Sequence, residues 1–372
     1  MTSRPHVSHE PAPDLILHHG KIVTVDGDFR VAQAVAIRGS RFMAVGSDDD
    51  VMGLAGQRTD LVDLRGKTVI PGIIDSHIHA FATGLRRAKQ LDFTDSKDLT
   101  LERMLAVIEQ RADATTPGEW IVVRGPYALD FITERRLPTR WELDAVTGDH
   151  PFYLMMQGHL GVVNSRALQL AGITELTPDP PGGKYYRDPD SGELTGVMLE
   201  WTAFDPFLSM IPDYSFEDKL KATRDIMESF SAVGITSLLN PGESRENVAV
   251  LEELCKRKEL TVRWNVLYFV WAKDYTGKPY EEVAAMLRDL GPADGFGDEW
   301  LRIGGIKIVA DGGFEGAYMR EPFMEDILGE GWRGIPTWEP ETLTTVLRAA
   351  GDVDVRVFVH ELGDAALDMV LD

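Results

Sequence analysis

Two histidines separated by one residue, His77 and His79, are the clearest chemical signal in the sequence. They follow the apolar run 68–70, which predicts a short buried strand that ends where the histidines begin. Because side chains alternate along a strand, we expect Asp75, His77 and His79 to share one face. Neutral imidazole is a common metal ligand, so the pair predicts half of a metal site. The alternative is that both rings only form hydrogen bonds in a polar loop, because so short a motif often occurs by chance.

A lysine inside the apolar run 301–309 is the second candidate. Alternation points Lys307 away from the isoleucines on either side, and into the fold if those isoleucines pack on helices. A buried ammonium group is unfavourable unless it is paired, neutralised or modified. One modification is carbamylation, in which the neutral amine adds carbon dioxide and gains two oxygens that can bridge two cations. The alternative is a buried salt bridge to Asp311 or Asp75.

A third apolar run, 355–359, ends in His360. A lone histidine at the end of a strand is more often structural than a ligand. Here, however, three predicted strands end in candidate ligands, and strand ends that converge at the mouth of a barrel are where that architecture builds its sites. The pattern therefore favours one metal site formed by His77, His79, Lys307 and His360.

Composition narrows the class of protein. With 372 residues the chain is expected to form about two domains. Its formal net charge of −22 disfavours nucleic acid and anionic membrane as partners and favours a small-molecule substrate. Residues 1–14 predict neither a signal peptide nor an anchor. Cys255 is the single cysteine, so no intrachain disulfide can form and we expect a cytoplasmic protein. The oligomeric state stays open, with a homo-oligomer as one option.

The chain divides by pattern near residue 69. We expect residues 1–13 to be a disordered tail and residues 14–68 to be a small β-sandwich domain. Its predicted strands are 15–25, 31–37, 42–45 and 61–64, with turns at 26–28 and 38–41.

From residue 69 to 372, strands separated by helical segments predict a parallel α/β domain. Residues 118–212 interrupt this rhythm and predict an insertion of the kind that shapes a substrate pocket. The predicted strands are 69–75, 234–239, 262–270, 301–309 and 355–359, which makes five βα units. The predicted helices are 100–114, 216–233, 247–258, 280–290, 341–350 and 364 onward.

Together these motifs resemble the amidohydrolase superfamily, and specifically its N-substituted formamide deformylase-like branch. The resemblance covers nearly the whole chain and rests on residues 71–79, 158–159, 163–168, 196–200, 307, 311–312, 360 and 363–366, which occur in the expected order. It implies a (β/α)8 TIM barrel, of which about five βα units are present, beside a composite β-sandwich. It also implies that His77 and His79 bind one metal, that carbamylated Lys307 bridges two metals, and that His360 binds the second.

The resemblance places three further residues near the substrate: His159, Glu200 and Asp311. Two of them have structural alternatives, since His159 could cap the helix expected near 164–170 and Glu200 could lie on a solvated face. A wall for the substrate could be formed by Arg124, Met198, Trp201 and Phe204, although aromatic and methionine side chains are more often part of a core.

The implied activity is hydrolysis of the C–N bond of a small amide or formamide by a metal-activated water, with one or two divalent ions and zinc as the default. Members of the superfamily carry a further histidine ligand and an aspartate base on later strands. The chain stops at Asp372, so we expect a fragment that lacks these groups and is inactive or poorly folded by itself. Two alternatives are a mononuclear hydrolase with unmodified Lys307, and a non-catalytic fragment that binds a small molecule or assembles with another chain.

Overall fold

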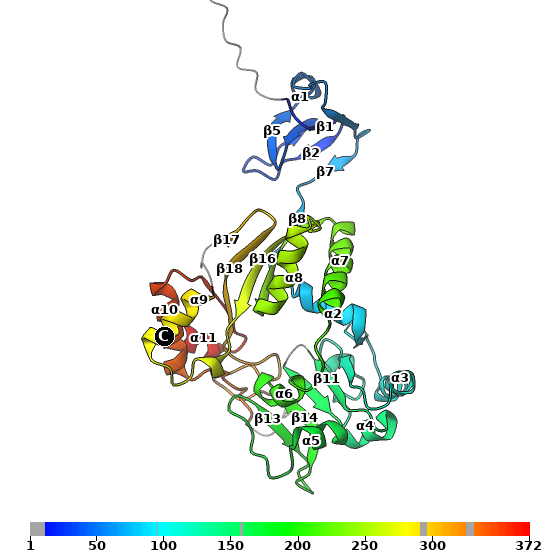
Figure 1. Cartoon of the computed structure of the whole chain (residues 1–372), viewed down its shortest axis with the longest axis vertical. Helices are drawn as coiled ribbons and strands as arrows, with labels where there is room; N and C mark the ends of the chain where they lie inside the picture. Colours follow the sequence, from blue (N-terminus) through cyan, green and yellow to red (C-terminus); the bar gives the residue numbers. More distant parts are fainter. Residues whose placement is uncertain (1–11, 95, 157–158, 291–295, 325–330) are drawn as a thin grey trace, which may run out of the picture. The chain divides into compact units, whose positions relative to one another are not determined.

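The computed structural model describes residues 12–94, 96–156, 159–290, 296–324 and 331–372 (Figure 1). Most of the predicted tail at 1–13 lies outside these residues. The chain divides into two compact units, Met1–Ile73 and Ile74–Asp372. In the part of the chain that is described, no helix is long and apolar enough to cross a membrane.

The first unit contains two small sheets around a core that includes Ile16 and Val51. Both predicted turns are confirmed, and Gly39 has the positive φ of 55° that the second turn requires. One sheet has the order β5-β4-β1-β6 and the other β3-β2-β7. The elements are β1 (Leu15–His18), β2 (Lys21–Val23), β3 (Val31–Ala32), β4 (Ala34–Arg38), β5 (Arg41–Gly46), α1 (Asp48–Met52), β6 (Asp60–Asp63) and β7 (Thr68–Val69).

The prediction of one continuous strand over residues 69–75 is wrong. Residues Thr68–Val69 form β7, which pairs with β2 in the first unit, whereas β8 (Ile73–Asp75) hydrogen-bonds to the sheet of the second unit. Pro71 has no N–H to donate to a ladder, so the chain leaves one sheet before it enters the other. Consequently His77 and His79 follow β8 instead of lying on it, and the prediction that they share one strand face is wrong.

A curled sheet dominates the second unit, and its strands follow one another in sequence order as β8-β15-β16-β18-β19. The pairs β15–β16, β16–β18 and β18–β19 are parallel, as predicted. Helices α7 and α8 lie beside this sheet (Figure 1). The further strands are β15 (Ile235–Glu243), β16 (Arg263–Phe269), β17 (Phe296–Gly297), β18 (Leu301–Val309) and β19 (Val357–His360). The helices are α2 (Ala80–Lys89), α7 (Phe216–Ala232), α8 (Arg245–Lys256), α9 (Tyr280–Asp289), α10 (Pro340–Asp352), α11 (Asp364–Leu371) and the short 3-10 helix η2 (Ala272–Asp274).

A second sheet, which we call the inserted sheet, lies between β8 and β15 in the sequence and has the order β13-β14-β12-β11-β10-β9. It begins ahead of residue 118, and the predicted helix at 100–114 packs on it as α3, not on the parallel sheet. Its strands are β9 (Leu91–Asp92), β10 (Ile121–Arg124), β11 (Phe152–Met156), β12 (Leu160–Val163), β13 (Lys184–Arg187) and β14 (Leu194–Leu199). Its helices are α3 (Leu101–Ala114), η1 (Leu129–Phe131), α4 (Arg140–Thr147), α5 (Ser165–Ala171) and α6 (Trp201–Leu208).

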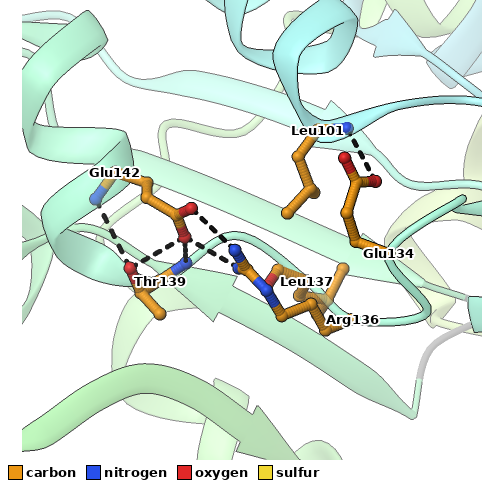
Figure 2. A network of polar contacts seen from close by, with 6 residues as sticks. All are labelled: Leu101, Glu134, Arg136, Leu137, Thr139 and Glu142. Atoms are coloured by element: carbon orange, nitrogen blue, oxygen red, sulfur yellow. Dashed lines mark hydrogen bonds and ion pairs between the residues drawn. The ribbon is translucent and has the colours of Figure 1, made fainter.

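Polar contacts fix the helix starts on one side of the inserted sheet (Figure 2). The backbone N–H of Leu101, at the start of α3, donates to Glu134 Oε2 at 3.0 Å. At the start of α4, the N–H of Thr139 donates to Glu142 Oε2 at 2.8 Å, and both terminal nitrogens of Arg136 donate to the same carboxylate at 2.8 Å. These bonds satisfy backbone donors that a helix cannot pair internally, so they define where each helix begins.

Candidate active site

A cavity of about 270 Å³ lies at the carboxyl ends of the parallel strands. His77, Lys307 and His360 all line it, so the structure brings together three of the four predicted metal ligands. The remaining lining side chains are Leu239 and Pro241 from β15, Leu267 from β16, and Phe358, Val359 and Glu361 from β19 and the residue after it. Glu361 has no counterpart among the residues predicted from the sequence, although its position next to His360 is the signal that could have identified it.

The fourth predicted ligand, His79, belongs to a short loop that we call the His-x-His loop, residues 76–79. The N–H of Ile78 donates to the carbonyl oxygen of Leu239 at 3.0 Å. Just beyond the loop, the N–H of Phe81 donates to Oδ1 of Asn240 at 3.2 Å. Leu239 and Asn240, two adjacent residues of β15, therefore hold the backbone on both sides of His79.

The two imidazoles of this loop lie near each other, with ring centroids 5.5 Å apart. Burial and the charge of Lys307 lower the pKa of His77, against the opposing charge of Asp75. Burial, followed by the charges of His77 and Lys307, lowers the pKa of His79 as well. Both side chains still have accessible surface. They are thus neutral near pH 7, and neutral imidazole is the form that binds a metal.

Lys307 points into the cavity, as predicted, because Ile306 and Ile308 pack in the apolar core with helices α9 and α10. Lys307 is only 5% exposed. No ion pair joins it to Asp75 or Asp311 in the described residues, so the salt-bridge alternative is wrong there. Burial lowers the pKa of its amine, and the charge of Glu361 opposes this only in part.

Asp311, which is predicted to lie near the substrate, joins two segments of backbone in the structure. It is fully buried, and its Oδ2 accepts hydrogen bonds from the N–H groups of Tyr318 at 2.9 Å and Gly363 at 2.8 Å. Its Oδ1 accepts one from Leu362 at 3.0 Å. Asp311 therefore ties the segment after β18 to the segment after β19, two residues beyond His360, and has no exposed surface for a ligand.

His159 and Glu200 form a pair that reaches the parallel sheet from the inserted sheet. His159 Nδ1 lies 2.9 Å from Glu200 Oε2, and the ring of His159 stacks on that of His360 at 5.5 Å with an interplanar angle of 17°. Both structural alternatives are wrong, since Asn164 caps helix α5 and Glu200 is 0% exposed. Burial raises the pKa of the Glu200 carboxyl, while His159 opposes that rise.

Glycines make room for this pair. A Cβ atom at Gly312 or Gly316 would lie 2.4 or 2.6 Å from Glu200 Oε1, and one at Gly313 would lie 2.8 Å from His159. Any side chain at these positions would displace the pair. Sequence reasoning missed this arrangement, although the spacing of the glycines after Asp311 was its signal. The backbone at Glu200 has φ of 66°, a strained value for a residue other than glycine.

His360 is the half-buried ring between these groups. Burial, with the charges of His159 and Lys307, lowers its pKa to about 4. The donors that line the cavity are thus two neutral imidazoles, those of His77 and His360, and the amine of Lys307, with the imidazole of His79 beside that of His77. This set suits zinc and similar divalent ions.

The donors do not form one compact cluster. In the described residues, the group of three histidine or carboxylate side chains with ligand atoms within 4.8 Å is His18, His19 and Asp48 in the first unit.

The four residues predicted as a substrate wall separate in the structure. Met198 and Phe204 belong to the core of the inserted sheet, whereas Arg124 and Trp201 keep accessible surface.

Comparisons with known proteins identify the family of the chain. Residues 60–372 match the amidohydrolase family. Over 96% of its length the chain is 31% identical to the N-substituted formamide deformylase of Arthrobacter pascens, covering 65% of that protein. It is 30% identical to the protein LONG AFTER FAR-RED 3 of Arabidopsis thaliana, covering 60% of it. The chain thus spans about three fifths of the length of these relatives.

Solved structures show the same fold. An uncharacterized metal-dependent hydrolase of Pyrococcus horikoshii superposes with a TM-score of 0.66 at 23% identity, over 96% of this chain and 67% of that one. From the match along residues 60–372, the chain belongs to the amidohydrolase family.

Proposed function

We propose that the protein is a metal-dependent hydrolase that cleaves a carbon–nitrogen bond, in an amide or formamide-like group of a small molecule. The observation that carries this proposal is the convergence of His77, Lys307 and His360 on one cavity at the carboxyl ends of parallel strands. Similarity to an N-substituted formamide deformylase supports the formamide-like branch. Because the chain spans only part of its relatives, we propose the activity, and a complete (β/α)8 barrel, for the whole protein.

In this proposal His77 and His79 hold one divalent ion and His360 holds the second. Lys307, carbamylated, lies between them, and its lowered pKa supports this because only the neutral amine adds carbon dioxide. Zinc is the first candidate for a histidine-rich hydrolytic site. When bound, such ions acidify a water molecule and polarise a carbonyl group.

The protein's own groups prepare the site for this chemistry. In this proposal Nδ1–H of His159 donates a hydrogen bond to Glu200 Oε2, which fixes the tautomer and leaves Nε2 free to bind the substrate. Stacking holds the ring of His159 against His360. Leu239, Leu267 and Phe358 give the cavity apolar walls, which strengthen polar interactions inside it by excluding water.

Metal content and hydrolysis test the proposal together. Purified protein reconstituted with zinc should contain two bound ions, and the double variant H77A/H79A should lose one of them. The matched control, H18A/H19A, removes the other close group of ligands and should leave hydrolysis of a formamide, amide and ester panel unchanged. Hydrolysis that is insensitive to chelators would refute the proposal. One ion per chain with unmodified Lys307, measured by mass spectrometry, would favour the mononuclear alternative.

A further inference from the structure

A second cavity with aromatic walls opens where the inserted sheet meets the parallel sheet. Its enclosed part is about 40 Å³. The lining includes Trp201 and Thr202 from the start of α6, Phe269 from the end of β16, Trp271 just before η2, and Val309 from the end of β18. We call it the aromatic cavity.

The aromatic cavity is the next layer beyond the cavity that His77, Lys307 and His360 line, which we call the metal cavity. Leu267 and Lys307 line the metal cavity, and Phe269 and Val309, two residues further along the same strands, line the aromatic cavity. Residues two apart on a strand point to the same side and are separated by about 7 Å. In addition, Trp201 directly follows Glu200. The strand register therefore places the aromatic cavity one layer of side chains beyond Lys307.

The rings are arranged to receive a flat apolar group. Phe269 and Trp271 have centroids 4.2 Å apart, and Trp201 meets Trp271 edge-on at 5.2 Å. All three rings are only partly buried, so part of their apolar surface faces the cavity. Aromatic rings gain most from covering such surface with another ring in an offset or edge-on arrangement.

Two polar features restrict the ligand further. Thr202 Oγ1 is buried and has no hydrogen-bond partner within the described chain, which is unfavourable unless a ligand supplies one. The charged groups of the wall, Lys273 and Asp205, already pair with each other, and Lys273 also lies 5.6 Å from the Trp271 ring. Among the described residues of the wall, no charged side chain is left unpaired for an ionic substituent.

We propose that the aromatic cavity binds the uncharged, aromatic substituent of the substrate, with a hydrogen bond from that substituent to Thr202. This rests on the proposed function for the reacting end of the molecule. The enclosed volume is well below the roughly 150 Å³ of a cavity known to hold benzene. The cavity therefore has room for only part of an aromatic ring.

The test separates binding from catalysis. Saturation-transfer NMR with acetanilide measures binding, and the kinetics of formanilide and N-methylformamide measure hydrolysis. W271A should weaken acetanilide binding about 10-fold and raise the KM of formanilide similarly, with the kinetics of N-methylformamide unchanged. T202V, a milder change, should show a smaller effect in the same direction. The matched control is W141A, because Trp141 is exposed on α4 and lines neither cavity.

The outcomes are distinct. If acetanilide binding depends on Trp271 but neither formanilide nor N-methylformamide is hydrolysed, the aromatic cavity is a binding site and the proposed function is refuted. A second outcome is that hydrolysis occurs but W271A and W141A do not differ in acetanilide binding or in formanilide kinetics. This would refute the proposed role of the aromatic cavity and leave the proposed function standing. If W271A fails to fold, T202V and W271F decide by the same binding measurement.

Discussion

The parallel sheet and the inserted sheet contribute to one site in different ways. The parallel sheet presents Lys307 and His360 from the ends of neighbouring strands, as the architecture itself requires. The inserted sheet contributes one pair, His159 and Glu200, which depends on local glycine spacing and a strained backbone. The positions of Lys307 and His360 follow from the order of the strands. The positions of His159 and Glu200 follow from close contacts with the neighbouring glycines. In the function that we propose, the metal donors therefore belong to the parallel sheet, and the groups that tune them belong to the inserted sheet.

The strongest way to break this division is to remove a donor of the parallel sheet. Lys307→Met keeps an apolar side chain of similar length in a position that is 5% exposed, so the fold should persist. Loss of the bridging group should reduce metal affinity by more than about 100-fold, beyond the range for groups that only support a ligand. Competition with a chromophoric chelator measures this. Unchanged affinity at both ion positions would show that Lys307 is structural.

Asp311 should affect stability more than any residue of the inserted pair. Asp311→Ala leaves three backbone N–H groups without their acceptor, those of Tyr318, Leu362 and Gly363. We expect the free energy of unfolding to fall by about 3 kcal/mol. Urea denaturation measures it, with Asp364→Ala, an exposed neighbour, as the control. A loss below about 1 kcal/mol would show that water can replace the three hydrogen bonds to Asp311.

On the side of the inserted sheet, Glu200→Gln removes a charge with little change in shape. The amide can present its NH2 group to His159 and so favour the other tautomer of the ring. We expect kcat to fall about 10- to 100-fold while two metal ions stay bound. Loss of metal in this variant would contradict the division between donors and tuning groups. The variant Asn164→Asp, at the nearby cap of α5, is a control for general damage to the inserted sheet.

Acid should weaken the metal-free protein through His360. Its pKa falls from the usual 6.5 to about 4 in the folded chain. Between these values the unfolded chain binds a proton that the folded chain does not, so stability decreases as pH falls from about 6.5 to about 4 and is level above. For a half-buried ring we expect about 1 to 2 kcal/mol. Urea denaturation at several pH values measures the slope, which should be smaller in His360→Gln. Equal slopes would contradict the assignment.

Sequence reasoning predicted the parallel sheet well because its signals are repetitive. The apolar run 301–309 coincides with β18, and alternation alone placed Lys307 toward the cavity. It failed where one residue changes the path of the chain, as Pro71 does between β7 and β8. The contacts of His159 with Glu200 and His360 join residues 41 and more apart through irregular backbone, and no local pattern encodes such a contact.

The smallest expected effect concerns how β15 holds the His-x-His loop. Asn240 is fully buried; its Oδ1 accepts from the N–H of Phe81 at 3.2 Å, and its Nδ2 donates to Glu243 at 2.7 Å. Asn240→Ala should leave that N–H unpaired and loosen the first turn of α2, which begins directly after His79. We expect a loss of affinity of about 3- to 10-fold at the His77 and His79 position, and none at His360.

Asn247→Ala is the matched control for this variant. Asn247 also donates to Glu243, at 2.9 Å, but has no bond to the start of α2. Both variants remove one donor from the same carboxylate, whose pKa burial raises to about 7. Only Asn240→Ala also releases Phe81. If both variants weaken metal binding equally, the effect comes from Glu243 and the packing of α8. If only Asn240→Ala weakens it, the parallel sheet positions its first two donors through a side chain of the neighbouring strand.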